Sequence, residues 1–299
     1  MFDPTIKQLK YLVSVSKHLH FGKAARDCFV SQSTLSAGIQ ELEKLLNVKL
    51  LERTKRTVLL TPLGKEISKK AELINLEITD IVDLAKASQK EIYGEIKLGV
   101  IPTIAPYTLP KIMPKLRKKY NGLNLKIVED QTANIYQMLI TGNLDLILIA
   151  KPYKTENIHI ELIKKDFFYV ATPNSSLLDI NRKKSLNRDD ISKSNMLLLD
   201  EGHCLRDHVL NVCSKETIKT IDTFKATSLL TLVQMVSNDA GITLLPEIVI
   251  NSPLVKNSNI KIIDFENKKN FREIVLCWRS SSPRMIEFQN FSKFLKEYV

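Results

Sequence analysis

The sequence predicts an α/β protein with a winged helix-turn-helix at its N-terminus. Three features of the chain lead to this prediction. Residues 1–60 show apolar residues at helical spacing and two short strand-like pieces, residues 61–90 repeat apolar residues every seven positions, and strand-like and helix-like segments alternate from Glu95 onward. A chain of 299 residues is long enough for two or three domains.

Composition narrows the class of protein further. Hydrophobic residues make up 44% of the chain and charged residues 26%, as in ordinary soluble proteins. The N-terminus has no signal-peptide pattern, and no apolar run approaches the roughly 18 residues that cross a membrane. We therefore expect a cytoplasmic protein with no membrane partner. In that reducing compartment its four cysteines are expected to be thiols at rest.

Residues 1–60 predict a DNA-binding domain. Helical spacing begins just after Pro4, Phe21–Cys28 forms a second short helix, and Ser31 is a good N-cap for a third helix. Two short strands, Lys49–Glu52 and Thr57–Leu60, follow as a wing. This part of the chain carries ten Lys and Arg against five Asp and Glu, and a basic domain suits a polyanion such as DNA.

The third helix offers a polar face that suits a DNA major groove. Its apolar residues form one stripe, and the opposite face carries polar side chains that can reach base edges and phosphates: Gln32, Ser33, Thr34, Ser36 and Gln40. The tip of the wing adds three basic side chains for the DNA backbone or minor groove: Arg53, Lys55 and Arg56. The alternative is an ordinary helical subdomain with a solvated polar face, which pattern and charge alone do not exclude.

Residues 61–90 predict a long connecting helix. Thr61 is the expected N-cap and Pro62 the first helical residue. Two interleaved rows repeat every seven residues: Ile67, Ile74 and Ile81, and Ala71, Ile78 and Ala85. Such a heptad seam favours pairing with a second copy, so that two recognition helices read a two-fold pair of half-sites. A single helix packed on its own domain is the alternative.

The remainder of the chain predicts a parallel α/β module. The expected strands are Ile96–Ile101, Leu123–Glu129, Leu144–Ile149, Phe167–Ala171, Met196–Leu199, Lys219–Ala226, Ile242–Leu245, Ile260–Phe265 and Ile274–Trp278. The expected helices are Pro106–Tyr120, Asn134–Thr141, Leu229–Ser237 and Arg284–Tyr298. Because no G-x-G-x-x-G follows a strand, dinucleotide binding is unsupported and no cofactor is expected.

We expect this module to fold into two lobes. The first lobe comprises residues 91–166 and 281–299, because the C-terminal helix is expected to return to it, and the second comprises residues 167–280. The chain would then cross between the lobes twice, with a cleft between them.

Two cysteines in the second lobe are the strongest candidates for chemistry. Cys204 and Cys213 bracket a segment of helical character, and His203, Arg206 and His208 surround the first of them. Cations beside a thiol favour the reactive thiolate. On a continuous helix nine residues rise about 13.5 Å, whereas a disulfide needs Cα atoms roughly 4.4–6.8 Å apart. A bond between these cysteines would therefore require the helix to break.

Two other interpretations of this pair remain open. Free intracellular cysteines are commonly small, inert core residues. A zinc site is the other, but the chain has no CxxC and adjacent His and Cys do not match ordinary ligand spacing, so no metal is expected.

The N-terminal motifs resemble the head of LysR-type transcriptional regulators. The resemblance rests on Ala24-Ala25, Val30-Ser31-Gln32-Ser33-Thr34-Leu35-Ser36, Ile39, Leu42-Glu43, Leu50-Leu51-Glu52-Arg53 and Leu60-Thr61-Pro62-Leu63-Gly64. It implies double-stranded DNA as a partner. It also implies that the two-lobed module is similar to periplasmic binding proteins, with most members of the family binding a small inducer in the cleft.

Further motifs resemble the peroxide-sensing OxyR branch of that family. They are Gly99-Val100-Ile101-Pro102-Thr103-Ile104-Ala105-Pro106-Tyr107, Gly202-His203-Cys204-Leu205-Arg206-Asp207, Cys213, Ala226-Thr227-Ser228-Leu229 and Gly241-Ile242-Thr243-Leu244-Leu245-Pro246. This resemblance implies that hydrogen peroxide oxidises Cys204 and that Cys213 closes a reversible disulfide. The resulting change in DNA contacts would control oxidative-stress genes.

The resemblance also assigns roles around the thiol and implies partners. Thr103 and Thr132 would orient peroxide, His203 and Asp207 would hold the local network, and Arg279 would lend positive charge. A helix N-cap is the alternative role for each threonine. The implied partners are further copies of the chain in a dimer of dimers, a cellular thiol reductant and RNA polymerase. The direction of regulation stays open.

Two alternatives to a peroxide-sensing regulator remain. One is a LysR-type regulator that answers a small-molecule inducer bound between the lobes. The other is an enzyme, a thiol peroxidase, which would share the reactive cysteine but has no use for a helix-turn-helix. We therefore expect a regulator and not an enzyme.

Overall fold

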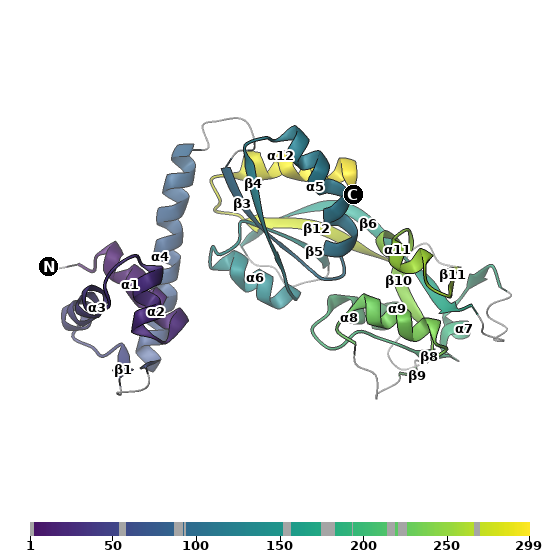
Figure 1. Ribbon diagram of the computed structural model, residues 1–299, viewed down its shortest axis with the longest axis horizontal. Coiled ribbons are helices and arrows are strands. Elements are labelled where there is room, and N and C mark those ends of the chain that lie inside the picture. The colour runs from purple at the N-terminus through teal and green to yellow at the C-terminus, as the bar shows by residue number, and fades with distance from the viewer. Residues whose placement is uncertain are drawn as a thin grey trace. The chain divides into compact units, whose positions relative to one another are not determined.

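The computed structural model describes residues 3–53, 58–86, 92, 94–151, 157–174, 183–192, 194–213, 219–220, 226–265 and 270–299 (Figure 1). It divides into two compact units, Met1–Gln89 and Lys90–Val299. No helix within these described ranges is long and apolar enough to cross a membrane.

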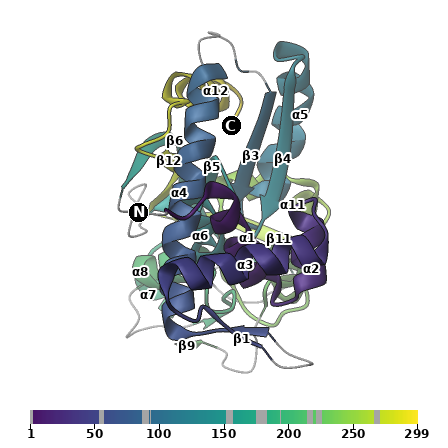
Figure 2. The same cartoon turned by 90° about the vertical axis from the view of Figure 1, so that its left-hand side faces the viewer.

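The first unit is a winged helix-turn-helix, as predicted. Its helices are α1 (Ile6–His18), α2 (Phe21–Asp27) and α3 (Gln32–Leu46), and its wing pairs β1 (Leu51–Arg53) with β2 (Val58–Leu60) in antiparallel register. Figure 2 views this unit with α3 in front and β1 beneath it. Of the predicted wing-tip residues, Lys55 and Arg56 lie outside the described residues, as does the side chain of Arg53.

Local capping explains where these helices begin. The Ser31 hydroxyl accepts a hydrogen bond of 3.1 Å from the Thr34 N–H, as its prediction as an N-cap requires. The buried stripe of α3 includes Leu35, Ile39 and Leu42. The neighbouring Glu43 carboxylate is also buried and accepts hydrogen bonds from the backbone at the start of the wing, which fixes the wing to the recognition helix.

The connecting helix α4 (Pro62–Lys86) begins as predicted, because the Thr61 hydroxyl accepts a hydrogen bond of 2.9 Å from the Gly64 N–H. Its first half packs against α1 and buries Ala71. Further along, Ile74 and Ile81 are 45% and 67% exposed. These two members of the predicted heptad seam are therefore uncovered in a single chain.

The second unit is built on one eight-stranded sheet in the order β4-β3-β5-β12-β6-β11-β7, with β10 paired to β6. Its strands are β3 (Gly94–Val100), β4 (Leu123–Glu129), β5 (Leu146–Lys151), β6 (Ile158–Pro173), β7 (Ser185–Leu186), β10 (Thr243–Pro246), β11 (Ile260–Phe265) and β12 (Phe271–Arg279). A separate parallel pair joins β8 (Asn195–Met196) to β9 (Lys219–Thr220).

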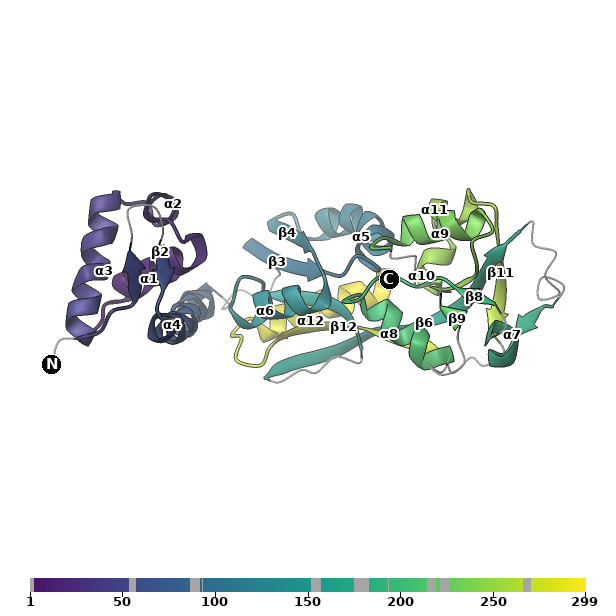
Figure 3. The same cartoon turned by 90° about the horizontal axis from the view of Figure 1, so that it is seen from below.

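Helices cover both faces of the sheet. They are α5 (Ala105–Lys119), α6 (Thr132–Ile140), α7 (Arg188–Ser192), α8 (Cys204–Cys213), α9 (Leu229–Ser237), α10 (Glu247–Ile250), α11 (Pro253–Lys256) and α12 (Met285–Tyr298). In the first lobe α5 and α12 lie on one face of the sheet and α6 on the other (Figures 1 and 3). The C-terminal helix α12 packs on β6 and α5.

The sheet differs from the predicted parallel arrangement in two ways. In this sheet β3, β4 and β5 form a parallel set and β7 runs parallel to β11, whereas β6 is antiparallel to β10, β11 and β12, and β12 is antiparallel to β5. In addition, β12 pairs with β5 through Glu273 opposite Lys151. It therefore belongs to the first lobe and not, as predicted, to the second. Strand order is set by tertiary contacts that periodicity does not encode.

The long strand β6 joins the two lobes. Its first half pairs with β12, and its second half pairs with β10 and β11. The sequence predicted only Phe167–Ala171 as strand, because Lys164, Lys165 and Asp166 interrupt the apolar pattern just before it. Along the chain, β11, which pairs with the second half of β6, is followed by β12, which pairs with the first half.

The turn between α2 and α3 contains a strained residue. Phe29 has a φ of 54° and is 96% exposed. The Val30 N–H bonds to the Ala25 carbonyl and the Phe29 N–H to the Arg26 carbonyl, a Schellman ending in which Gly or Asn is the usual residue at this left-handed position.

We predict that Phe29→Asn stabilises the protein by about 1 kcal/mol, because asparagine tolerates this backbone conformation and no packing is lost. Thermal unfolding measures the effect. The reverse substitution at a second residue with left-handed backbone conformation, Asn47→Phe, should lower the melting temperature. An unchanged or lower melting temperature for Phe29→Asn would contradict this account of the turn.

Candidate functional site

The two candidate cysteines occupy the ends of one helix, as predicted. The ten-residue helix α8 begins at Cys204 and ends at Cys213, and neither cysteine forms a disulfide. Nine residues of helical rise separate their Cα atoms by about 13.5 Å, beyond the reach of a disulfide. Cys213 is 2% exposed, and burial raises its pKa to about 11. It is therefore a protonated, covered thiol while α8 is intact.

Cys204, in contrast, opens onto a cavity of about 200 Å³. The cavity is lined by Thr132, Ala133, Gly202, Cys204, Asp207, His208 and Asn211. Cys204 is half-buried: it borders this cavity, and the protein covers the remainder of the side chain. Cys204 also lines a recess of about 10 Å³, together with Thr103, Thr132 and His203. The cavity is large enough for a small oxidant, whereas the recess is no larger than one water molecule requires.

The structure brings Thr103 and Thr132 together at this thiol. Thr132 is the first residue of α6, its hydroxyl is buried, and that hydroxyl makes no bond of ordinary geometry within the described residues. It nevertheless lies near enough to Cys204 to lower the pKa of the thiol as a donor. Thr103 lies in the turn before α5. Neither threonine caps a helix, because the N-cap residues are Ile104 and Gln131.

The cation at this site is Arg272, which the sequence reasoning missed. Its side chain is 1% exposed on β12 and pairs with Asp166, with 2.9 Å between Nε and Oδ2. Its Nη1 donates to the Thr103 hydroxyl at 2.9 Å and its Nη2 to the Thr103 carbonyl at 3.1 Å. An arginine near the start of an apolar strand was the only sequence feature that could have indicated it.

The structure places Arg279 elsewhere, so its predicted role beside the thiol is wrong. Its guanidinium donates to the carbonyl oxygens of Leu139 and Leu144 at 2.9 and 2.7 Å, where the α6–β5 connection begins and ends. Arg272 and Arg279 lie seven residues apart on β12, or about 23 Å in an extended strand. They cannot serve the same thiol.

The predicted cationic surroundings of Cys204 also need correction. Burial raises the pKa of the Cys204 thiol above its ordinary value, and the Arg272 charge opposes this shift. Burial lowers the pKa of His203 and of His208, so that both are neutral at pH 7. Arg206 donates to the Leu199 carbonyl. Positive charge therefore reaches the thiol from β12 and not from its sequence neighbours.

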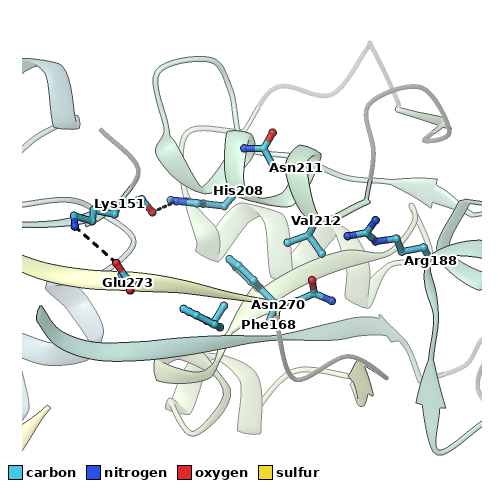
Figure 4. Close-up of a pocket in the computed structure, with 9 residues that line it drawn as sticks. Lys151, Phe168, Arg188, His208, Asn211, Val212, Asn270 and Glu273 are labelled. Atoms are coloured by element: carbon cyan, nitrogen blue, oxygen red, sulfur yellow. Dashed lines mark hydrogen bonds and ion pairs between the residues drawn. The ribbon is translucent and has the colours of Figure 1, made fainter. Parts of the chain in front are cut away.

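Asp207 and His208 form the side of the cavity nearest the middle of α8. The Asp207 charge raises the pKa of Cys204. A nitrogen of His208 hydrogen-bonds to the Lys151 carbonyl, which ties α8 to β5 (Figure 4). His208 and Asn211 also line a neighbouring cavity of about 400 Å³, where the Lys151 ammonium pairs with Glu273 at 3.9 Å.

The predicted DNA-facing residues occupy the solvent side of α3. Gln32, Ser33, Thr34 and Gln40 are exposed, and Ser36 is half-buried. They come from one face of the helix whose opposite face forms the core of the unit.

We predict that Arg272, and not Arg279, sets the reactivity of Cys204. Removing both charges of the pair with Asp166→Asn and Arg272→Gln should raise the pKa of Cys204 further and slow its alkylation by iodoacetamide across neutral pH. Arg279→Gln is the matched control and should leave the alkylation profile unchanged. Arg272→Gln alone should also cost about 3–5 kcal/mol of stability, because it leaves Asp166 buried and unpaired. Equal alkylation profiles for the two arginine variants would refute the assignment.

Family comparisons agree with both units. Residues 6–65 match the helix-turn-helix of bacterial regulatory proteins of the lysR family, and residues 89–299 match the LysR substrate binding domain. The regulator EstR of Acinetobacter baylyi is 39% identical over 98% of this chain and 96% of its own. The dual regulator OxyR of Escherichia coli is 32% identical over 97% of this chain and 94% of its own.

Solved structures show the same relationship. A variant of full-length OxyR from Pseudomonas aeruginosa superposes with a TM-score of 0.81 at 32% identity, covering 99% of this chain and 96% of that one. A hydrogen-peroxide-bound OxyR variant from Corynebacterium glutamicum gives a TM-score of 0.66 at 30% identity, covering 99% and 93%. Sequence motifs, fold and relatives coincide, and the chain belongs to the LysR family of transcriptional regulators, as a member of OxyR type.

Proposed function

We propose that this regulator senses hydrogen peroxide through Cys204 and stores the signal as a disulfide with Cys213. The observation that carries the proposal is the placement of the thiols: one opens onto a small polar cavity at the start of α8, and the other is buried at its end. Relatives named as hydrogen peroxide-inducible genes activators, including that of Haemophilus influenzae at 33% identity, support it.

The residues around Cys204 suit peroxide. The Thr103 hydroxyl accepts from Arg272, so its own proton is left to donate, and the Thr132 hydroxyl can donate or accept. The sulfur attacks one peroxide oxygen, the O–O bond breaks, and the products are a sulfenic acid and water. The Cys213 sulfur then displaces hydroxide from the Cys204 sulfur, and this hydroxide leaves as water with the Cys213 proton.

The second step requires α8 to unwind. Cys213 cannot reach Cys204 along an intact helix, and a thiol with a pKa of about 11 is a poor nucleophile where it lies. A ten-residue helix has little stability of its own, so the burial of Leu205, Val209 and Val212 is what holds it. After oxidation of Cys204, formation of the disulfide would favour an unwound segment, whereas the packing of these side chains favours the helix. The segment α8 would therefore have two states, helical when reduced and unwound when oxidised.

The same proposal extends to DNA and to assembly. The polar face of α3 would read base edges in the major groove, and the exposed apolar row of α4 would pair with a second copy. Two such dimers would form the tetramer. A cellular thiol reductant would reduce the disulfide to the two thiols. RNA polymerase would be the partner of the regulator on DNA.

A second candidate function is a response to a small-molecule inducer. It rests on a cavity of about 560 Å³ between the two lobes, lined on one side by Tyr107 and Glu129 and on the other by Thr227, Ser228 and Leu254. A regulator of this kind would keep its response after Cys204→Ser. In a peroxide sensor the same change would abolish the response, and the protein would behave as the reduced form does.

We predict that a brief, near-stoichiometric dose of peroxide joins Cys204 to Cys213 and changes the DNA footprint. Non-reducing peptide mapping identifies the bond. Cys213→Ser should stop at a sulfenic acid on Cys204, Cys204→Ser should abolish the response, and Cys277→Ser, a change at a buried strand residue, should respond like the parent protein. An unmodified Cys204 thiol under these conditions would defeat the proposal.

We also predict that Ile81→Asp weakens self-association by about 2 kcal/mol, because it places a charge in an apolar seam. Affinity for a two-fold DNA site should fall in parallel, since two linked heads bind together. Sedimentation and DNA titration measure the two effects. Lys69→Asp, on the same helix away from the apolar rows, is the control. If both variants associate like the parent protein, α4 is not the pairing surface.

A further inference from the structure

We propose that His208 is the group that removes the proton from the Cys204 thiol when peroxide attacks. The inference rests on the proposed function and adds a catalytic residue to it. It starts from a requirement of the site: burial keeps the resting Cys204 thiol protonated, and a sulfur attacks peroxide only as it loses that proton. A base must therefore lie within reach.

The helix places His208 on the same side of α8 as the thiol. The two residues lie four apart, which brings their Cβ atoms within about 6 Å of each other. Both side chains line the 200 Å³ cavity that admits the oxidant. Figure 4 shows His208 reaching from α8 toward β5.

Hydrogen bonding fixes which nitrogen of His208 is basic. Its Nε2 bonds to the Lys151 carbonyl, and because a carbonyl only accepts, this nitrogen carries the proton. In the neutral ring Nδ1 then holds the free electron pair. Nδ1 is buried and has no hydrogen-bond partner within the described residues. The basic nitrogen therefore belongs to a side chain that lines the same cavity as the thiol.

The surrounding charges keep His208 in its basic form and still allow it to take a proton. Burial lowers its pKa, and the Arg272 charge on β12 acts in the same direction. The Lys151 and Cys204 carbonyls and the Asp207 carboxylate oppose that shift, because each stabilises an imidazolium. The Lys151 ammonium is itself paired with Glu273.

The other candidates fit less well. His203 is also neutral, but it lines the 10 Å³ recess, which is too small for peroxide, and does not line the 200 Å³ cavity. Arg272 is a cation and has no proton-accepting nitrogen. Asp207 shares the cavity, but a carboxylate is ordinarily a weaker base than an imidazole.

The proton balance of the step is closed. The Cys204 proton passes to His208 Nδ1 as the sulfur bonds to the nearer peroxide oxygen and the O–O bond breaks. The imidazolium then returns this proton to the departing hydroxide, which leaves as water. Sulfur loses two electrons to peroxide, and His208 finishes as it began.

The test compares pH–rate profiles for sulfenic acid formation in a Cys213→Ser background, where the reaction stops before the disulfide. His208→Gln is the informative variant, because a glutamine amide can still donate to the Lys151 carbonyl but has no basic nitrogen. The oxidation rate of the background protein should be nearly constant from pH 7 to about pH 8, where neutral imidazole and thiol coexist.

We expect His208→Gln to oxidise on the order of 100-fold more slowly at pH 7, which is within the usual contribution of a general base. Its rate should rise about tenfold per pH unit, because only the ionised thiol then reacts. His159→Gln, on β6 and outside the lining of the Cys204 cavity, should keep the flat profile. Added imidazole should restore the rate of His208→Ala, in which the deleted ring leaves room for it.

Three results would overturn the inference or its basis. A His208→Gln protein with the parent rate and a flat profile would show that His208 takes no proton. Failure of imidazole to rescue a folded His208→Ala protein would show the same. If the Cys213→Ser protein itself forms no sulfenic acid, the proposed function fails, whatever the role of His208.

Discussion

The geometry of α8 is the constraint on which the rest of the site depends. An α-helix fixes the distance between its ends, and here those ends are the two cysteines. They can coexist as thiols without bonding, because about 13.5 Å of helical rise separates them. Buried side chains on α8 contribute roughly 1.5–3 kcal/mol each when aliphatic, and they hold it folded. Oxidation at Cys204 is thereby linked to the packing of the whole of α8. The packing of α8 is in turn linked to the surrounding lobes.

The reactivity of Cys204 is set by contacts from other elements. Arg272 comes from β12, its partner Asp166 from β6, and the Thr103 that it holds from the turn before α5. Because Asp166 also accepts from the Ile248 N–H, this one buried pair fixes both the charge at the thiol and the local packing of α10. A polar cluster of this kind is costly to disturb, so the cavity keeps its shape until α8 itself changes.

Elements that depend on neighbouring residues in the sequence were predicted better than contacts between residues far apart in the chain. Caps at Ser31 and Thr61 and the short apolar periods placed the helices of the first unit, and helix α8 was predicted between its two cysteines. The place of β12 beside β5 was not predictable, since neighbours in a sheet come from anywhere in the chain. For the same reason Arg279 was chosen and Arg272 missed. His203 and His208 were taken as cations because a sequence gives residue types but not burial, which is what makes them neutral.

Hydrogen–deuterium exchange of the amides of Leu205–Cys213 tests the linkage between helix and bond most directly. In the reduced protein these amides should exchange slowly, as expected for a packed helix. After one equivalent of peroxide they should exchange much faster, while the neighbouring helix α9 keeps its protection. Equal, slow exchange across α8 in protein whose two sulfurs are joined would contradict the account, because the bond would then have formed without the helix giving way.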